Sequence, residues 1–379
     1  MSAASPAIGD RSLTSVQGTV TAVQANYYWV TLQAERGTDP RFEDANLEEV
    51  SEDSLRLLCT RRSRLKKIGQ QVMVGDRVQL EEIDWTSKRA AISDVYPRHT
   101  QIDRPPVANA DQILLVFALA EPSLDPFQLS RFLVKAESTG LSVGLCLNKC
   151  DLVTGQAQEE WSDRLQQWGY KPVIVSLAQG SSLTAVEHQL SQKITVVSGP
   201  SGVGKSSLIN RLIPEIQLRV SAVSGKLGRG RHTTRHVELF QLPQGGLLAD
   251  SPGFNQPDLQ CQPSELAQFF PEVRQRLAEN SCQFSNCLHR NEPNCVVRGV
   301  WERYEHYLTF LDEVVTYQEA MRQSSEAEPT TKFKNRAAGK LEAEPKLATK
   351  RYRRPSRKTE KQTLQHLYQD AETSWGEGD

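Results

Sequence analysis

The sequence contains no long hydrophobic segment. Its longest purely apolar run, residues 113–120, is too short to span a bilayer as a helix. Residues 1–11 are polar, so we expect no secretory signal peptide. The seven cysteines are an odd number, which favours reduced thiols over a disulfide framework. These absences argue against a membrane or exported protein and predict a cytoplasmic one with no membrane partner.

A strong net charge is also absent. The 379 residues carry a formal net charge of −1, which conceals an acidic stretch at residues 43–53 and a basic stretch near the C-terminal end. Chains of this length usually form two or three domains, and the apolar content is ample for their cores. We therefore expect more than one domain.

Short segments rich in β-branched and aromatic residues indicate an all-β domain at residues 15–98. Residues 18–23 and 27–32 are predicted strands, residues 72–78 contain a Gly-Asp turn, and residues 89–95 form another short strand. Several short strands joined by turns suggest a small barrel, and we predict one of the oligonucleotide-binding (OB) type.

A basic cluster lies between these strands at residues 59–67. On such a barrel its side chains would match the phosphate backbone of a nucleic acid. A solvated charged loop explains the same composition equally well. The candidate RNA contacts are Arg61, Arg62, Arg64, Lys66 and Lys67.

The periodicity changes after residues 97–110, which contain three prolines and are predicted to be a linker. Apolar runs of strand length then alternate with segments of helical spacing. The predicted strands are residues 111–117, 141–147 and 173–176, and the predicted helices are residues 126–138 and 161–168. This alternation predicts a mostly parallel sheet that binds its ligand at the carboxyl ends of the strands.

A phosphate-loop pattern follows a further predicted strand at residues 194–197 and precedes a predicted helix at residues 207–213. Glycines let the backbone turn its N–H groups towards phosphate oxygens, Lys205 would reach the β- and γ-phosphates, and Ser206 would offer a hydroxyl to Mg²⁺. A glycine-rich turn that binds nothing is disfavoured because strand, helix and Lys-Ser are all present. The predicted phosphate-binding residues are Gly199, Pro200, Ser201, Gly202, Val203, Gly204, Lys205, Ser206 and Ser207.

An Asn-Lys-x-Asp sequence stands at the end of the predicted strand 141–147 and points to guanine. The Asp151 carboxylate would accept hydrogen bonds from guanine N1–H and the exocyclic amine, whereas adenine would leave it unpaired. Asn148 would tie this loop to the phosphate loop, and Ser176 would meet the guanine carbonyl through its backbone N–H. Such a sequence is often an ordinary surface turn, but here it follows a buried strand. The predicted guanine-binding residues are Asn148, Lys149, Cys150, Asp151 and Ser176.

Two later segments are candidates for sensing the γ-phosphate. Residues 224–235 are glycine-rich and basic, which suits a switch that contacts Mg²⁺ through Thr233 or Thr234, although a plain flexible loop fits equally well. A predicted hairpin of residues 237–242 and 247–249 is followed by Asp250, a candidate for the Mg²⁺ shell. The predicted magnesium residues are Ser206, Thr234 and Asp250.

The residue after Gly253, whose N–H would sense the γ-phosphate, is Phe254 rather than a glutamine that would orient the attacking water. We therefore expect slow unaided hydrolysis or a water positioned by another group, for which His232 is a candidate. The predicted catalytic residues are His232, Thr234 and Gly253.

The order of these motifs is reversed relative to ordinary GTPases, in which the phosphate loop comes first. Here the base-reading motif precedes the phosphate loop by about 50 residues. This order indicates a circular permutation, which places the segment after Asp250 next to the C-terminal region.

A Cys-x4-Cys-x-His-x5-Cys cluster predicts a structural Zn²⁺ site in that region. Three thiolates and one imidazole close a tetrahedral shell and leave no open position on the metal. A disulfide pair or unrelated thiols are the alternatives. The predicted ligands are Cys282, Cys287, His289 and Cys295. Helical periodicity at residues 264–278 and 300–318 predicts a small helical domain around the metal.

The C-terminal segment loses apolar periodicity from about residue 324. Residues 332–361 carry twelve Lys or Arg and three Glu, with two aromatic residues interleaved. This composition predicts a disordered tail suited to an RNA backbone, while an anionic membrane is disfavoured because no apolar face is present.

The chain resembles the circularly permuted GTPases that act with the small (30S) ribosomal subunit during its late maturation. The motifs that carry this resemblance are residues 148–151 ahead of 199–207, the switch at 228–235, residues 250–253 and the Cys-Cys-His-Cys cluster. Two features depart from the family: Ser251 stands where threonine is usual, and the basic tail is not part of the family pattern.

The resemblance implies a GTPase that hydrolyses GTP to GDP slowly alone and faster with the small subunit, and whose barrel and zinc domain grip 16S-type rRNA. A monomer with one Zn²⁺ and a Mg²⁺·GTP site is expected. The alternatives are an RNA-binding assembly factor in which GTP only gates affinity, and another P-loop NTPase. The predicted segments are a disordered N-terminus (1–14), the OB barrel (15–98), the permuted multidomain α/β GTPase core (99–260), the zinc-binding helical domain (261–323) and the basic disordered tail (324–379).

Overall fold

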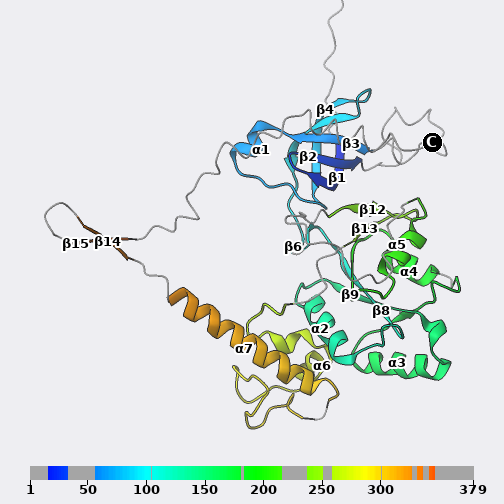
Figure 1. Cartoon of the computed structure of the whole chain (residues 1–379), viewed down its shortest axis with the longest axis vertical. Helices are drawn as coiled ribbons and strands as arrows, with labels where there is room; N and C mark the ends of the chain where they lie inside the picture. The colour runs from blue at the N-terminus through cyan, green and yellow to red at the C-terminus, as the bar shows by residue number, and fades with distance from the viewer. Residues whose placement is uncertain are drawn as a thin grey trace, which may run out of the picture. The chain divides into compact units, whose positions relative to one another are not determined.

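The computed structural model in Figure 1 describes residues 16–32, 56–103, 105–180, 183–215, 237–250, 258–299, 301–326, 331–335 and 341–345. The chain divides into two units, residues 1–315 and 316–379. The first unit contains a barrel, an open sheet with helices and a small helical region that carries the cysteine cluster. No helix among these described residues is long and apolar enough to cross a bilayer.

Five strands form the N-terminal closed barrel. Their order is β1-β2-β3-β5-β4, with β4 returning to β1, and β3 and β5 are the parallel pair. The strands are β1 (Val16–Gln24), β2 (Tyr27–Leu32), β3 (Arg56–Arg61), β4 (Arg77–Asp84) and β5 (Arg89–Val95), and a short helix α1 (Ser63–Lys67) follows β3. Alternate residues of β2 are buried, as expected for a strand with one face on a core. The predicted OB-type barrel is confirmed.

The segment predicted to be a linker is instead partly a hairpin. Strands β6 (Gln101–Asp103) and β7 (Pro106–Ala108) pair antiparallel. Ile102 and Val107 face each other in this register and both are buried in the core of the neighbouring sheet. The prediction was wrong because the prolines obscured this apolar pair, and because Pro106 is tolerated in a two-stranded ribbon, where one edge needs no N–H donor.

A buried ion pair fixes the turn at the base of the barrel to the segment that leaves it. Asp76 is fully buried, and its two carboxylate oxygens accept from Nε and Nη2 of Arg98 at 2.7 and 2.9 Å. Hydrogen bonding to Asp76 raises the pKa of the Arg98 guanidinium. The preceding Gly75 has a φ of 89°, and a Cβ there would overlap the Ala108 carbonyl. The barrel and the β6–β7 hairpin are therefore closely packed.

The central sheet has six strands in the order β10-β9-β8-β11-β13-β12, all parallel except β12. All seven residues of β8 are buried, as expected for a strand covered on both faces. The predicted mostly parallel sheet is confirmed. The strands are β8 (Gln112–Ala118), β9 (Ser142–Asn148), β10 (Val173–Ile174), β11 (Ile194–Ser198), β12 (Leu239–Gln241) and β13 (Leu247–Asp250). Its helices are α2 (Pro126–Glu137), α3 (Gly155–Gln167), α4 (Thr184–Leu190) and α5 (Lys205–Leu212), with a short 3₁₀ turn η2 (Cys150–Leu152) after β9.

The C-terminal helical region has a 3₁₀ turn η3 (Leu266–Phe269), helix α6 (Pro271–Glu279) and the long helix α7 (Tyr304–Glu326). The predicted helix at residues 264–278 is divided because Pro271 lacks an N–H and begins a new helix at its first position. Aromatic side chains of α7 and of the segment before α6 form the core here, including Phe270, Tyr307 and Phe310.

Within the segment predicted as a disordered tail, the structure describes the end of α7 and one pair of strands. Strands β14 (Thr331–Asn335) and β15 (Leu341–Pro345) pair antiparallel, with position 332 opposite 344 and position 334 opposite 342. The N-terminal residues 1–14 and the acidic stretch at 43–53 lie outside the described residues.

Replacing Asp76 by Ala should destabilise the barrel by about 3 kcal/mol, because the Arg98 charge would lose its partner in a mostly buried site. Arg62→Ala is the control, since its ion pairs with Glu81 and Glu82 are exposed and should contribute less than about 1 kcal/mol. Native-state hydrogen exchange of β1 and β4 measures both effects. Equal effects of the two substitutions would contradict the role of the buried pair.

Candidate nucleotide site and metal centre

The phosphate-loop residues follow β11 and lead directly into α5, as the sequence predicts. Gly199, Gly202 and Gly204 have positive φ values of 141°, 81° and 101°. A Cβ at Gly199 would overlap the carbonyl oxygen of Val116 on the neighbouring strand β8. Only glycine accepts both this conformation and this close contact. The glycine at position 199 therefore lets the loop turn tightly against the sheet.

The Lys205 side chain lies over this loop. Its ammonium donates to the carbonyl oxygens of Gly199 at 2.9 Å and Pro200 at 2.5 Å. Lys205 is also the first residue of α5, so its charge adds to the positive end of the helix dipole. Positive charge and helix N-terminus together form an anion-binding arrangement.

The Asn-Lys-x-Asp segment lies beside the phosphate loop, although about 50 residues separate the two in the chain. Asn148 is buried at the end of β9, and its Nδ2 donates to the Val203 carbonyl at 2.9 Å. A Cβ at Gly204 would overlap the same Nδ2 atom. The Asn-Lys-x-Asp loop and the phosphate loop can approach this closely only because residue 204 has no side chain.

A residue that sequence reasoning missed completes this contact. The backbone N–H of Leu177 donates to Oδ1 of Asn148 at 3.3 Å, so both ends of the Asn148 amide are held. Leu177 follows the buried Ser176, which was predicted to face the base. The sequence carries no distinctive signal for Leu177, since any residue with a backbone N–H would serve.

Asp151 and Ser176 lie together at the carboxyl ends of β9 and β10. The Ser176 hydroxyl donates to the Asp151 carboxylate, which orients it. Lys149 adopts a left-handed conformation with φ of 61°, and its ammonium donates to the carbonyl of Glu121. Burial raises the pKa of the Cys150 thiol, with a smaller contribution from Asp151. The predicted guanine-binding residues thus lie together at the carboxyl ends of neighbouring strands.

The predicted magnesium and catalytic residues are only partly described. Ser206 stands in the first turn of α5, next to Lys205. Asp250 ends β13 and is paired in parallel register with Val197, two residues before the phosphate loop begins. His232, Thr234 and Gly253 lie outside the described residues, as do Thr233 and the whole predicted switch at 224–235.

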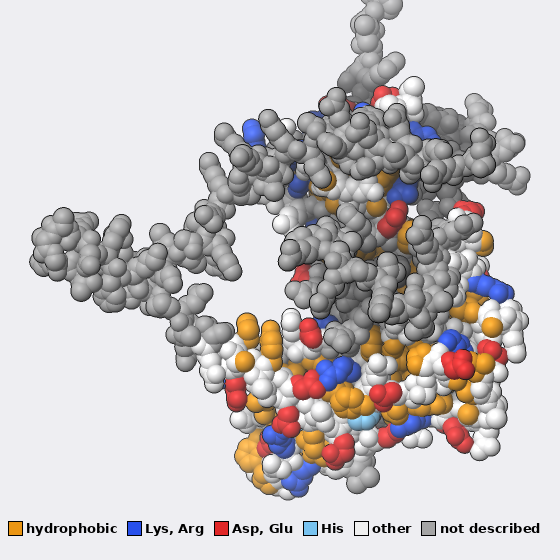
Figure 2. Space-filling view, in the orientation of Figure 1, with side chains coloured by type: hydrophobic (Ala, Val, Ile, Leu, Met, Phe, Trp, Pro, Cys, Tyr) orange, Lys and Arg blue, Asp and Glu red, His pale blue; other side chains and the backbone are white. Residues whose placement is uncertain are grey.

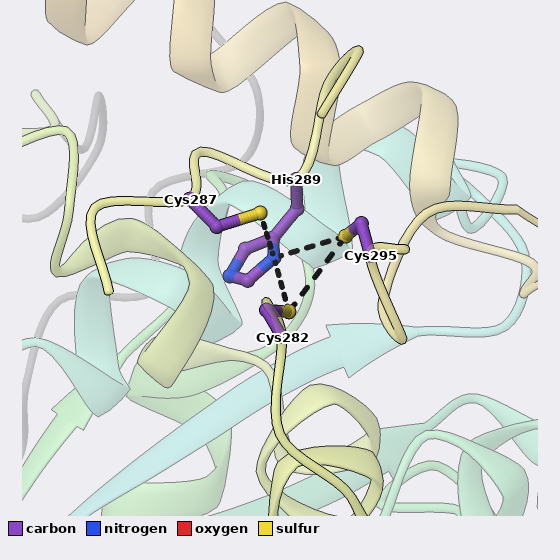
Figure 3. A group of neighbouring side chains, drawn as sticks. All are labelled: Cys282, Cys287, His289 and Cys295. Atoms are coloured by element: carbon purple, nitrogen blue, oxygen red, sulfur yellow. Dashed lines mark hydrogen bonds between the residues drawn. The ribbon is translucent and has the colours of Figure 1, made fainter. Parts of the chain in front are cut away.

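The four predicted metal ligands converge on one point, as Figure 3 shows. The Nδ1 atom of His289 lies 3.6, 3.4 and 3.3 Å from the sulfurs of Cys282, Cys287 and Cys295, and the sulfurs of Cys282 and Cys295 are 3.9 Å apart. A tetrahedral ion with bonds of about 2.3 Å to sulfur and about 2.0 Å to nitrogen places nitrogen about 3.5 Å from each sulfur, and the sulfurs about 3.8 Å from one another. The donor set therefore fits a structural metal ion.

Surrounding groups hold this cluster in place. The Glu292 carboxylate accepts hydrogen bonds from the backbone N–H groups of Leu288, Arg290 and Asn291, and although burial opposes the charge these bonds lower its pKa to about 2. The Tyr304 hydroxyl on α7 donates to the His289 carbonyl at 2.8 Å. Burial and the neighbouring thiols raise the pKa of Cys287 to about 12, so a cation would be needed to favour its thiolate.

The basic cluster of the barrel divides into two groups. Arg61 donates to the Gln70 carbonyl and lies over the Tyr28 ring, while Arg62 pairs with Glu81 and Glu82. The exposed members are on helix α1: Arg64, Lys66 and Lys67. Figure 2 shows basic and acidic side chains interspersed over the described surface of the face it presents.

Comparison with known proteins gives consistent matches. The family model described as RsgA GTPase matches residues 95–260. The chain is 60% identical to the small ribosomal subunit biogenesis GTPase RsgA of Trichormus variabilis, over 94% of this chain and 97% of that protein. It is 52% identical to the protein of the same name from Synechocystis, over 92% of this chain and 94% of that protein.

Two solved structures resemble most of this chain. YjeQ from Thermotoga maritima is 27% identical, with a TM-score of 0.64, covering 79% of this chain and 99% of that one. YloQ, described as a circularly permuted GTPase, is 29% identical with a TM-score of 0.64, covering 82% of this chain and 99% of that one. The second match agrees with the motif order of this sequence.

Gly204→Ala should destabilise the protein by about 1–3 kcal/mol more than Gly140→Ala, because it displaces the Asn148 amide and leaves buried polar groups unpaired. Gly140 is a matched control, since its φ of 73° also disfavours alanine but its Cβ would meet nothing within 4 Å. Urea denaturation of both variants measures the difference. If the two variants lose equal stability, the contact between the two loops does not constrain residue 204.

Proposed function

Because this chain belongs to the RsgA family of GTPases, we propose that it reads guanine with Asn148–Asp151 and holds the phosphates with residues 199–207. It is a GTP hydrolase of small ribosomal subunit biogenesis. The observation that carries the assignment of the site is the hydrogen bond from Asn148 to the Val203 carbonyl. It joins a base-reading loop to a phosphate loop in space, where the sequence separates them.

Specificity for guanine is assigned to Asp151. Its carboxylate would accept from N1–H and the exocyclic amine of guanine, and the Ser176 hydroxyl fixes its orientation. Adenine offers no N1–H, so it would leave a desolvated carboxylate unpaired. Lys149 would lie along the base plane, and its left-handed backbone turns the chain from β9 towards Asp151.

Phosphate binding is assigned to the loop backbone and Lys205. Lys205 would exchange its two carbonyl contacts for β- and γ-phosphate oxygens, which carry a full charge and bind an ammonium more strongly. Ser206, Asp250 and Thr234 would hold Mg²⁺, which neutralises charge that develops on the phosphates. Gly253 would sense the γ-phosphate, and His232 is our candidate for orienting water.

The absence of glutamine after Gly253 supports slow hydrolysis by the isolated protein. Membership of a family named for small ribosomal subunit biogenesis supports stimulation by that subunit. We assign the contact with rRNA to the barrel, where α1 presents Arg64, Lys66 and Lys67 to solvent. Arg61 and Arg62 would contribute less, since protein groups already engage them. We further propose a cytoplasmic monomer that acts late in subunit maturation.

We assign Zn²⁺ to the cysteine cluster, with a structural role. Three thiolates and an imidazole are soft to borderline ligands that favour zinc over magnesium or calcium, and four protein ligands leave no site for substrate. The cluster would hold the loop before α7 in place.

Turnover of GTP and ATP, with and without purified small ribosomal subunits, tests this function. We expect the protein to hydrolyse GTP and not ATP, at a low rate. Small subunits should increase this rate by at least about tenfold, since activators of such sites supply large rate factors. The Lys205→Ala variant should remain inactive under both conditions. Equal turnover of ATP would contradict the guanine assignment, and a rate unaffected by subunits would contradict the proposed activator.

Metal analysis tests the zinc assignment. We expect about one zinc per chain in the wild type and less than half of that in Cys287→Ser, because hydroxyl is a poor zinc ligand. Cys261→Ser is the matched control, since that cysteine lies outside the cluster. Full zinc content in Cys287→Ser, or another metal in the purified protein, would contradict the assignment.

A further inference from the structure

The barrel and the nucleotide-binding sheet meet at a backbone bridge. Strand β4 pairs with residues 16–19 of β1, and the turn before β4 continues along this edge through the hydrogen bonds of Val20 with Gly75 and Asp76. Ala22 of β1 pairs antiparallel with Glu238, the residue before β12. The barrel therefore continues into the open sheet at this point.

Side chains reinforce this bridge. Arg56 of β3 pairs with the Glu238 carboxylate at 2.8 Å, and its guanidinium lies 4.9 Å from the centre of the Trp29 ring. Trp29 is in turn the register partner of Ala22. The carboxylate of Glu238 is thus held by Arg56 of β3, while its backbone bridges β1.

Hydrophobic contacts lie directly beside the bridge on both sides. Val237 is buried in the core of the open sheet, and Val23 of the barrel packs partly against that same core. A displacement of β1 would therefore move both the bridge and this packing. The bridge is part of a packed joint, and not an isolated surface contact.

From Glu238 the paired strands lead to the phosphate loop. β12 pairs with β13, which ends at Asp250, and β13 pairs with β11, which ends one residue before Gly199. Consecutive strands bonded in this way move together more readily than strands joined by loops. The order β2-β1-Glu238-β12-β13-β11 connects the predicted RNA-binding domain to both predicted phosphate-binding elements.

We infer that Glu238 and Arg56 are positioning residues that couple the barrel to the nucleotide site. Nucleotide binding at the phosphate loop stiffens β1 through this joint, and by reciprocity a ligand that orders the barrel alters the nucleotide site. This inference rests on the proposed function, because it requires a nucleotide at residues 199–207. It adds the route by which rRNA bound at the barrel would influence the site that binds GTP.

Hydrogen exchange of the full-length protein, with and without a non-hydrolysable GTP analogue, tests the inference. We expect the analogue to slow exchange at residues 199–212 and, by about threefold, at residues 20–24 of β1. Glu238→Arg and Arg56→Glu should each weaken the response in β1 and keep the response at the phosphate loop. The double reversal should restore it, because the ion pair re-forms with opposite polarity.

Glu82→Arg is the matched control, since it reverses a charge in an exposed ion pair within the barrel. It should leave the response of β1 unchanged. If the phosphate loop is protected but β1 never responds, or if single reversals respond as the wild type does, the coupling is wrong. If the analogue protects neither segment, the proposed nucleotide site itself fails, and the coupling fails with it.

Discussion

The hydrogen bond between Asn148 and the Val203 carbonyl is the contact on which the site depends. It needs a glycine at position 204, because a side chain there would overlap the Asn148 amide. It also needs β8 between β9 and β11, so that the two loops leave the sheet at the same edge. Chain order does not enter these requirements. A permuted chain therefore builds the same site, provided that the strand order is kept.

Permutation does change what the sheet is attached to. The strand that ends at Asp250 now precedes, in the chain, the region that carries the cysteine cluster, and this region is fixed to the sheet domain by a fully buried Arg303. Arg303 pairs with Glu272 and lies 4.7 Å from the Trp168 ring, at the end of α3. The helix that follows the predicted guanine motif thus packs directly against the region that carries the cysteine cluster. The predicted nucleotide site thus has this packed region on one side and the barrel joint at Glu238 on the other edge of the sheet.

The parts predicted from sequence are those in which local residue types determine the chemistry. The motif at 199–207, the Asn-Lys-x-Asp segment and the cysteine cluster each contain their own signal, and the alternation of strand and helix predicts the sheet. Apart from the contact of Asn148 with the phosphate loop, contacts between distant residues could not be predicted in this way. No sequence pattern marks the pairs that meet only in the folded chain, which are Asp76 with Arg98 and Ala22 with Glu238. The hairpin of β6 and β7 was missed because its three-residue strands are shorter than any periodicity can reveal.

Calorimetric titration of GDP and ADP into the wild type and Asn148→Ala tests most directly whether the two loops act as one site. We predict that the wild type binds GDP and not ADP, and that Asn148→Ala weakens GDP binding by at least about tenfold, since the loop contact is lost and Val203 is left unpaired. Asn148 need not touch the nucleotide for this effect. Unchanged GDP affinity in Asn148→Ala, or equal affinity of the wild type for ADP, would contradict the joined guanine and phosphate loops.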